Sequence, residues 1–231
     1  NVPGFSATAY LFARRLQKSL GVPVGIIVSA WGGSSILGWM PSSAVARSIS
    51  ESEKQAVLNS CGTDKDQPSV LYNAMIAPIV GYSAKGFIWY QGEANVATPA
   101  IYGKMLRGLV QSWRAAWGDK KNNMPFYAVE IAPYRYGKMC ELKFERPLTV
   151  EATVDALNSL PNTAVAPTGD IGESVVIHPA KKREVGDRLA MLALRNQYGY
   201  GDLGCYPPAI KKIEYRDGSA FIYTEGTDIA T

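Results

Sequence analysis

Length, composition and charge set the first limits on this chain. Its 231 residues, 47% of them hydrophobic, can bury one sizeable core. No apolar run is long enough to cross a bilayer. The net charge of +4 arises from 24 basic and 20 acidic side chains spread along the chain, a pattern that does not favour nucleic-acid binding.

Three cysteines are far apart in the sequence and lack metal-ligand spacing: Cys61, Cys140 and Cys205. We expect one disulfide or none, and no metal or organic cofactor. The chain opens at Asn-Val-Pro-Gly without an initiator methionine or a signal peptide. We therefore expect that the start of the gene product was removed or is not part of this sequence, so localisation is not directly readable.

The first predicted elements are a helix and a strand. After Phe5-Ser6, apolar residues at helical spacing followed by Gly21 predict a helix with a serine cap and a glycine stop. The continuous apolar run at residues 22–29 predicts a strand buried on both faces of a parallel sheet. Residues 42–68 carry no recognisable code and are interpreted as loops.

Strands and helices then alternate. Residues 86–90, 125–131 and 164–168 predict three further strands. Thr98-Pro99 is predicted to cap a helix with an apolar stripe from Tyr102 to Trp117. A last helix is predicted after His178 from four apolar positions: Val185, Leu189, Leu192 and Ala193. This order predicts an α/β fold with a parallel sheet covered on both faces.

Four polar loops directly follow predicted strands, at residues 29–35, 91–95, 133–135 and 169–170. Because ligands bind beyond the carboxyl ends of the strands of an open parallel sheet, we expect these loops to converge on one rim. The predicted substrate contacts on this rim are Trp31, Gly32, Glu93 and Arg135. Core packing is the alternative for Trp31.

Backbone and side-chain donors on this rim could stabilise an oxyanion. Gly32 and Gly33 allow close backbone approach, so that an exposed N–H could face developing negative charge. The Gln91 amide could supply a second donor. An ordinary tight turn is the alternative for the two glycines.

His178 is the only histidine in the chain and precedes the last predicted helix. An imidazole at a helix N-terminus is kept neutral by the helix dipole, so His178 is the predicted general base near neutral pH. A surface position or a hydrogen-bonded core position is the alternative.

Several motifs together resemble one known family. They are Trp31-Gly-Gly-Ser, Ile88-Trp-Tyr-Gln-Gly-Glu-Ala-Asn95, Ile177-His-Pro, and the segments at residues 71–78 and 182–190. From about Phe5 to about Gly199, the chain resembles the sialate O-acetylesterase family of SGNH hydrolases. The resemblance implies a three-layer α/β/α sandwich with a parallel, flavodoxin-like sheet, and removal of O-acetyl groups from sialic acid, acetylated xylan or other glycans.

The resemblance also implies residue roles. His178 would be the base, Gly33 and Gln91 the oxyanion donors, and Asn95 a supporting residue of its loop. The family's nucleophilic serine lies in a Gly-Gln-Ser-Asn stretch at the end of the first strand, and no such stretch occurs here. We therefore expect the serine upstream of this sequence and a sheet that lacks its first strand. The rim serines are interpreted as residues that bond locally to backbone: Ser29, Ser34 and Ser35.

A second departure concerns the acid that orients the histidine. The family often has an aspartate three residues before it, where this chain has Val175. Asp170 is the predicted replacement and is counted among the catalytic residues; Glu173 or a backbone carbonyl are alternatives. A turn cap is the alternative role for Asp170.

Near the end of the chain, two alternating runs surround Asp217-Gly218, a strong hairpin signal. Residues 204–208 are interpreted as a linker. We therefore predict an esterase domain at residues 1–203, and a linker at residues 204–231 that opens or joins a β-rich accessory domain.

The leading prediction is a carbohydrate O-acetylesterase, secreted or periplasmic by the resemblance. Its predicted partners are an O-acetylated sugar and, within the same protein, an N-terminal segment and the accessory domain. A catalytically silent glycan-binding relative is the first alternative. A flavodoxin-like nucleotide or flavin domain ranks last, because no glycine-rich phosphate loop follows the first predicted strand.

Overall fold

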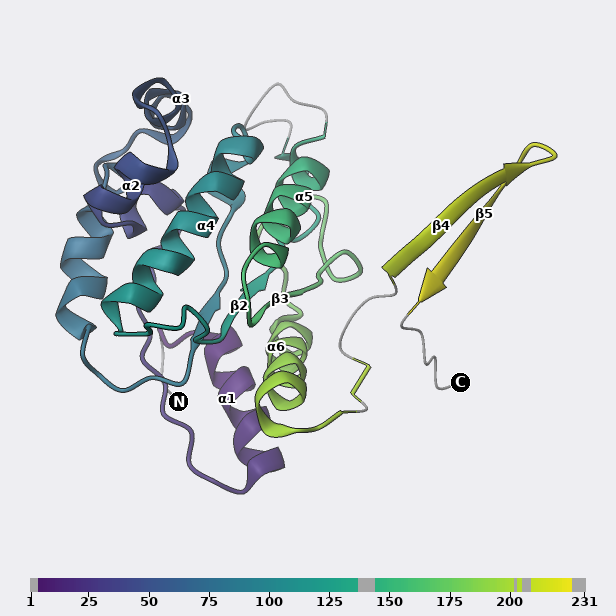
Figure 1. Cartoon of the computed structure of the whole chain (residues 1–231), viewed down its shortest axis with the longest axis horizontal. Helices are drawn as coiled ribbons and strands as arrows, with labels where there is room; N and C mark the ends of the chain where they lie inside the picture. The colour runs from purple at the N-terminus through teal and green to yellow at the C-terminus, as the bar shows by residue number, and fades with distance from the viewer. Residues whose placement is uncertain (1–3, 137–143, 202, 205–208, 226–231) are drawn as a thin grey trace.

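The computed structural model describes residues 4–136, 144–201, 203–204 and 209–225. Its centre is a three-stranded parallel sheet (Figure 1). In spatial order the strands are β1 (Phe87–Trp89), β2 (Phe126–Val129) and β3 (Thr163–Ala166). The three strands predicted at residues 86–90, 125–131 and 164–168 are therefore confirmed, with slightly different bounds.

Helices cover both faces of this sheet, which confirms the three-layer α/β/α architecture. One layer consists of α1 (Ala7–Leu20) and α6 (Lys182–Tyr198), and the other of α4 (Pro99–Ala116) and α5 (Glu145–Asn158). Successive β2 side chains alternate between the layers: Phe126 and Ala128 join the core under α4 and α5, whereas Tyr127 and Val129 join the core under α1 and α6. Within the described residues, no helix is both long and apolar enough to span a membrane.

The predicted ends of the first helix are confirmed. The Ser6 hydroxyl accepts a hydrogen bond from the Ala9 N–H at 3.2 Å, and Gly21 ends α1 with a φ of 69°. At the start of α4, Pro99 occupies the first turn as predicted. The predicted cap from Thr98 is wrong, because its hydroxyl is buried and makes no hydrogen bond to any described residue.

The predicted strand at residues 22–29 is wrong. Among the described residues no strand pairs with this segment, and the exposed fractions of Val22, Ile27 and Val28 are 50%, 54% and 41%. An apolar run becomes a strand only where a neighbour satisfies its backbone hydrogen bonds. Val24 nevertheless packs against the core under α1 and α6, so the segment runs beside the sheet without joining it.

The interpretation of residues 42–68 as loops is also wrong. This stretch forms α2 (Ser42–Ser48), α3 (Glu51–Cys61) and the 3₁₀ turn η2 (Asp64–Asp66), and it follows η1 (Ile36–Trp39). Its clearest sequence signal is Ser50 three residues before Glu53, which the structure shows as a capping box. Further short turns are η3 (Tyr72–Ile76), η4 (Ala77–Ile79) and η5 (Glu93–Asn95).

The predicted hairpin is confirmed as β4 (Ala209–Arg216) and β5 (Ser219–Glu225), which pair antiparallel. Asp217 and Gly218 have φ angles of 49° and 73°, as a two-residue hairpin turn requires. Residues 205–208 of the predicted linker lie outside the described residues, as do Cys140 and Cys205. The predicted domain boundary between residues 203 and 204 therefore stays a prediction.

Candidate functional site

Two predicted loops meet beyond the end of β1, where Asn95 ties them together. Asn95 is fully buried; its Oδ1 accepts from the Ile36 N–H at 3.0 Å and from Gln91 Nε2 at 2.8 Å. Its Nδ2 donates to Ser35 Oγ at 3.0 Å. Both polar atoms of the Asn95 side chain thus bond to the loop after Gly33, which is consistent with the predicted supporting role.

Gln91 joins the same pair of loops. Its Nε2 donates to the Ser34 carbonyl at 2.9 Å as well as to Asn95, so both amide hydrogens have partners inside the protein. Its Oε1 is buried without a hydrogen-bond partner among the described residues. To act as an oxyanion donor, Gln91 would have to give up one of these two hydrogen bonds and donate to the oxyanion instead.

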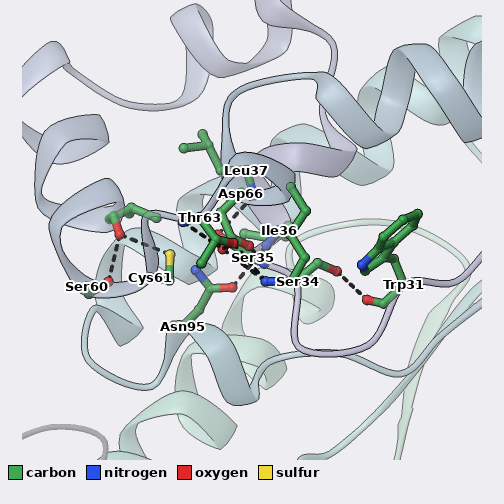
Figure 2. Close-up of polar contacts among 12 residues, drawn as sticks. Trp31, Ser34, Ser35, Ile36, Leu37, Ser60, Cys61, Thr63, Asp66 and Asn95 are labelled. Atoms are coloured by element: carbon green, nitrogen blue, oxygen red, sulfur yellow. Dashed lines mark hydrogen bonds and ion pairs between the residues drawn. The ribbon is translucent and has the colours of Figure 1, made fainter.

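Asp66 contacts the loop after Gly33 and was missed by the sequence analysis. Its buried carboxylate accepts from the Ser35 N–H at 2.6 Å, from the Thr63 hydroxyl at 2.5 Å and from Lys65 Nζ at 3.2 Å. Figure 2 shows Ser35 of this loop between Asp66 and Asn95. Burial raises the pKa of Asp66, but the hydrogen bonds from Thr63, Ser35 and Lys65 outweigh burial and hold the pKa below its ordinary value.

The predicted local hydrogen bonds to backbone are confirmed for Ser34 and Ser35, whereas the prediction is wrong for Ser29, whose partner is 46 residues away. Ser34 Oγ donates to the Trp31 carbonyl at 2.7 Å and accepts from Trp39 Nε1 at 2.8 Å. Ser35 Oγ accepts from the Leu37 N–H at 3.3 Å, and Ser29 Oγ donates to the Met75 carbonyl at 3.2 Å. None of these hydroxyls lies next to a described base in the way that a nucleophile requires.

The segment before Ser34 is exposed. Gly33 has a φ of 66°, and neither it nor Gly32 has a heavy atom within 4 Å of the position that a Cβ would take. Trp31 is 56% exposed, which contradicts the core-packing alternative for this side chain. The open space beside Gly33 leaves room for a ligand against its backbone.

A group of charged and aromatic side chains lies next to this loop pair. Half-buried Lys182 at the start of α6 places its Nζ 5.0 Å from the centre of the Tyr90 ring. Burial raises the pKa of Glu93, opposed by nearby backbone N–H groups and by the charges of His178 and Lys182. Burial and the charge of Glu93 raise the pKa of Tyr90 to about 12. His178 and Lys182 therefore lie near enough to Glu93 for their charges to influence its carboxyl group.

His178 is exposed, and its ring makes no hydrogen bond to any described residue. The helix after it begins only at Lys182. The predicted dipole argument is therefore wrong, because the field of a helix terminus falls off within its first turn. The electrostatic partner that the structure offers is Glu93.

Asp170 is held by Arg188 rather than by His178. Arg188 donates to Asp170 Oδ1 and Oδ2 at 2.7 and 2.6 Å, and also to the Pro167 carbonyl at 2.7 Å. This bidentate pair lowers the pKa of Asp170 to about 2. The orienting role of Asp170 stays a prediction, and its geometry here also fits the alternative of a loop-fixing residue.

The loops after β2 and β3 are joined by a second set of contacts that the sequence analysis missed. Glu130 accepts from Arg146 Nη2 at 2.7 Å and from the Thr168 N–H at 2.6 Å. The Arg135 N–H donates to the Ser174 carbonyl at 3.1 Å, which places the exposed Arg135 beside the loop that leads to His178. The structure therefore joins the loops after β2 and β3 to each other, while Asp170 itself is held by α6.

Comparisons with known proteins point in one direction. The family model described as carbohydrate esterase, sialic acid-specific acetylesterase matches residues 2–195. The chain is 30% identical to the sialate O-acetylesterase of Pongo abelii and 29% identical to that of Homo sapiens, in each case over 90% of this chain and 42% of the relative. The chain thus spans less than half the length of these curated relatives.

A solved structure agrees with these relatives. The crystal structure of a carbohydrate acetylesterase from Xanthomonas citri superposes with a TM-score of 0.81 at 35% sequence identity. The superposition covers 97% of this chain and 48% of that chain. The predicted resemblance and the predicted fold are therefore both confirmed.

Proposed function

Because this chain belongs to the family of sialic acid-specific acetylesterases among the carbohydrate esterases, we propose that it is the core of an enzyme that removes acetyl groups from sugars. The substrate is an O-acetylated sialic acid or a related glycan. The observation that carries the proposal is the hydrogen bond from Gln91 to the Ser34 carbonyl, which joins the two loops that hold the proposed oxyanion donors.

The nucleophile in this proposal is a serine on a strand that lies upstream of this sequence. Two features support a position for that strand between β1 and the segment at residues 22–29. β1 pairs with β2 on one side and with no other described strand. The apolar segment at residues 22–29, whose Ile27 and Val28 are exposed, lacks a strand partner within the described residues. A strand that paired with both would carry its carboxyl end to the rim that holds Gly33 and Gln91.

The reaction is acyl transfer in two steps. His178 takes the proton of the serine hydroxyl as the serine oxygen attacks the acetyl carbonyl carbon. The Gly33 N–H and the Gln91 amide hold the resulting oxyanion, with Gln91 exchanging its bond to the Ser34 carbonyl. His178 then gives the proton to the departing sugar hydroxyl, and water releases acetate from the serine by the same path. These steps use no metal or organic cofactor.

Two carboxylates compete for the role of orienting His178. Asp170 is the acid that the sequence predicts, and it is already bound by Arg188. Glu93 interacts with the charge of His178 and lies on the same loop as Gln91. We therefore place Glu93 beside Asp170 as a second candidate, in addition to its predicted role in substrate binding.

The sugar is proposed to lie across the exposed part of the rim. Trp31 offers an exposed indole face for stacking on a sugar ring, and the backbone of Gly32 lies open beside it. Arg135, exposed on the loop after β2, is a donor for hydroxyl or carboxylate groups. Because such glycans lie outside the cytoplasm, we propose a secreted or periplasmic location.

The test is hydrolysis of 4-nitrophenyl acetate and of an O-acetylated sialic acid by the full-length protein. His178→Ala should lower kcat/KM by about 10³-fold, since a general base is lost. Of Glu93→Gln and Asp170→Asn, the variant with the larger loss of kcat identifies the orienting acid. An active His178→Ala variant would overturn the mechanism, and an inactive protein that still binds the sugar would favour the glycan-binding alternative.

A further inference from the structure

The outer face of α4 forms a pocket with α2 that has no part in the proposed reaction. Figure 1 shows the two helices side by side. The pocket has a volume of about 340 Å³. None of its lining residues belongs to the loops that carry Gly33, Gln91 or His178. It is therefore a separate feature of the surface.

The two helices approach each other closely at Gly108. A Cβ on Gly108 of α4 would lie 2.0 Å from Ser48 Oγ of α2, so any side chain here would require the Ser48 hydroxyl to move. The α4 residues that line the pocket share one outer stripe of the helix, with Lys104, Arg107 and Gln111 exposed on it. Arg47 of α2 lines the same pocket.

The charges of this pocket are unbalanced. Its lining contains three cations, Arg47, Lys104 and Arg107, and no acidic residue. Lys104 is paired with Glu53 of α3 at 2.6 Å. This pairing lowers the pKa of Glu53 to about 2, so the acid stays ionised at neutral pH. Within the described residues, neither Arg47 nor Arg107 has an ion pair or a side-chain hydrogen bond to another residue.

We propose that this pocket binds the carboxylate of an acidic sugar. Two unpaired guanidinium groups supply planar pairs of donors, the geometry that carboxylates accept bidentately. Ser48 and the Gln111 amide are within the same lining and offer partners for sugar hydroxyls. A volume of about 340 Å³ is at the lower end of small-molecule pockets and suits one sugar unit rather than a polymer.

The experiment measures binding of N-acetylneuraminic acid to the full-length protein by calorimetry, with N-acetylglucosamine as the neutral comparison. We expect the double variant Arg47→Gln/Arg107→Gln to weaken binding of the acidic sugar at least 10-fold. The matched control, Arg14→Gln/Arg15→Gln, removes the same charge from exposed positions of α1 and should change binding less than twofold. Hydrolysis of 4-nitrophenyl acetate should be the same in both double variants, which separates this pocket from the proposed active site.

A further variant, Glu53→Gln, is expected to strengthen binding and so tests the proposal in the opposite direction. Glu53→Gln keeps a side chain that can serve in the capping box with Ser50, but it releases Lys104 from its ion pair. We expect this variant to bind the acidic sugar about threefold more tightly. Thermal unfolding of each variant establishes that it is folded.

Three results would overturn the proposal: equal affinities for the two arginine double variants, equal affinities for the acidic and the neutral sugar, or weaker binding by Glu53→Gln. Inorganic phosphate serves as a further probe. Phosphate binding that depends on Arg47 and Arg107, without binding of the acidic sugar, would assign the pocket to phosphate groups and reject the carboxylate.

Discussion

The proposed site has two halves that are held in different ways. The inner half, made of residues 34–36 with Asn95 and Asp66, is buried and cross-linked by hydrogen bonds. The outer half, made of residues 31–33 and His178, is exposed, and the His178 ring has no hydrogen bond within the described chain. The fold therefore preorganises the inner half through buried hydrogen bonds, whereas the outer half has fewer contacts that fix its geometry.

The largest stability effect is expected in the inner half, from Asn95→Ala. This change leaves the buried Ile36 N–H without its partner and removes one of the hydrogen bonds to Ser35 Oγ, and we expect a loss of about 2–4 kcal/mol in the free energy of unfolding. Urea denaturation measures it. Asn59→Ala, at an exposed position of α3, is the control and should cost at most about 0.5 kcal/mol. Equal losses would mean that the inner half is not rigid.

Asp66→Asn is expected to have the next largest effect, about 1–3 kcal/mol at pH 7. Because the pKa of Asp66 is lowered in the folded protein, its contribution is present above the pKa of the unfolded chain and is lost as the pH falls through the folded value. Urea denaturation at pH 7 and pH 3 should therefore show a larger loss for the wild type than for the variant. Asp64→Asn, exposed in the same turn, should follow the wild type.

Gly33→Ala tests the outer half through its backbone. The φ of 66° at Gly33 disfavours a side chain, although no neighbouring atom blocks one, and we expect a cost of about 1 kcal/mol. Gly32→Ala is the control, since its φ does not lie in the left-handed region. If the two variants unfold at the same urea concentration, the loop before Ser34 adapts without strain.

The smallest effect is expected for Ile27→Ser in the 231-residue chain, at most about 0.5 kcal/mol, because Ile27 is 54% exposed. In the full-length protein the same change should cost about 1–3 kcal/mol if the proposed strand covers it. Val175→Ser, at a residue that is 73% exposed, should have the same small effect in both proteins. An equally small effect of Ile27→Ser in the full-length protein would argue against the strand.

Some local signals in the sequence predicted local structure correctly, although the cap from Thr98 was wrong and the capping box at Ser50 was overlooked. Ser6 and Gly21 mark the ends of α1, and Asp217-Gly218 marks the turn of the hairpin. In each case the residues that form the structure are neighbours in the chain, so their preferences are readable without the fold. The prediction at residues 22–29 was wrong for the opposite reason, because a strand depends on a partner that is distant in sequence.

The same distinction explains which site residues were found. Gln91 and Asn95 follow a strand directly, so the rule for parallel sheets places them on the rim. Asp66 reaches Ser35 across 31 residues, and Arg188 reaches Asp170 across 18. Such pairings appear only after folding, although Thr63 and Asp66 have the spacing of a capping box and could have marked the turn.

Cys61, a free and half-buried thiol at the end of α3, lies against the inner half, with its Sγ donating to the Val57 carbonyl at 3.0 Å (Figure 2). Burial raises its pKa, opposed by a hydrogen bond with Ser35, so little reactive thiolate forms at neutral pH. We therefore expect Cys61 to be alkylated more slowly in the folded protein than in the urea-unfolded chain. With Cys140 and Cys205 replaced by serine, the ratio of these two rates measures how well the fold protects Cys61, without a substrate or an introduced label.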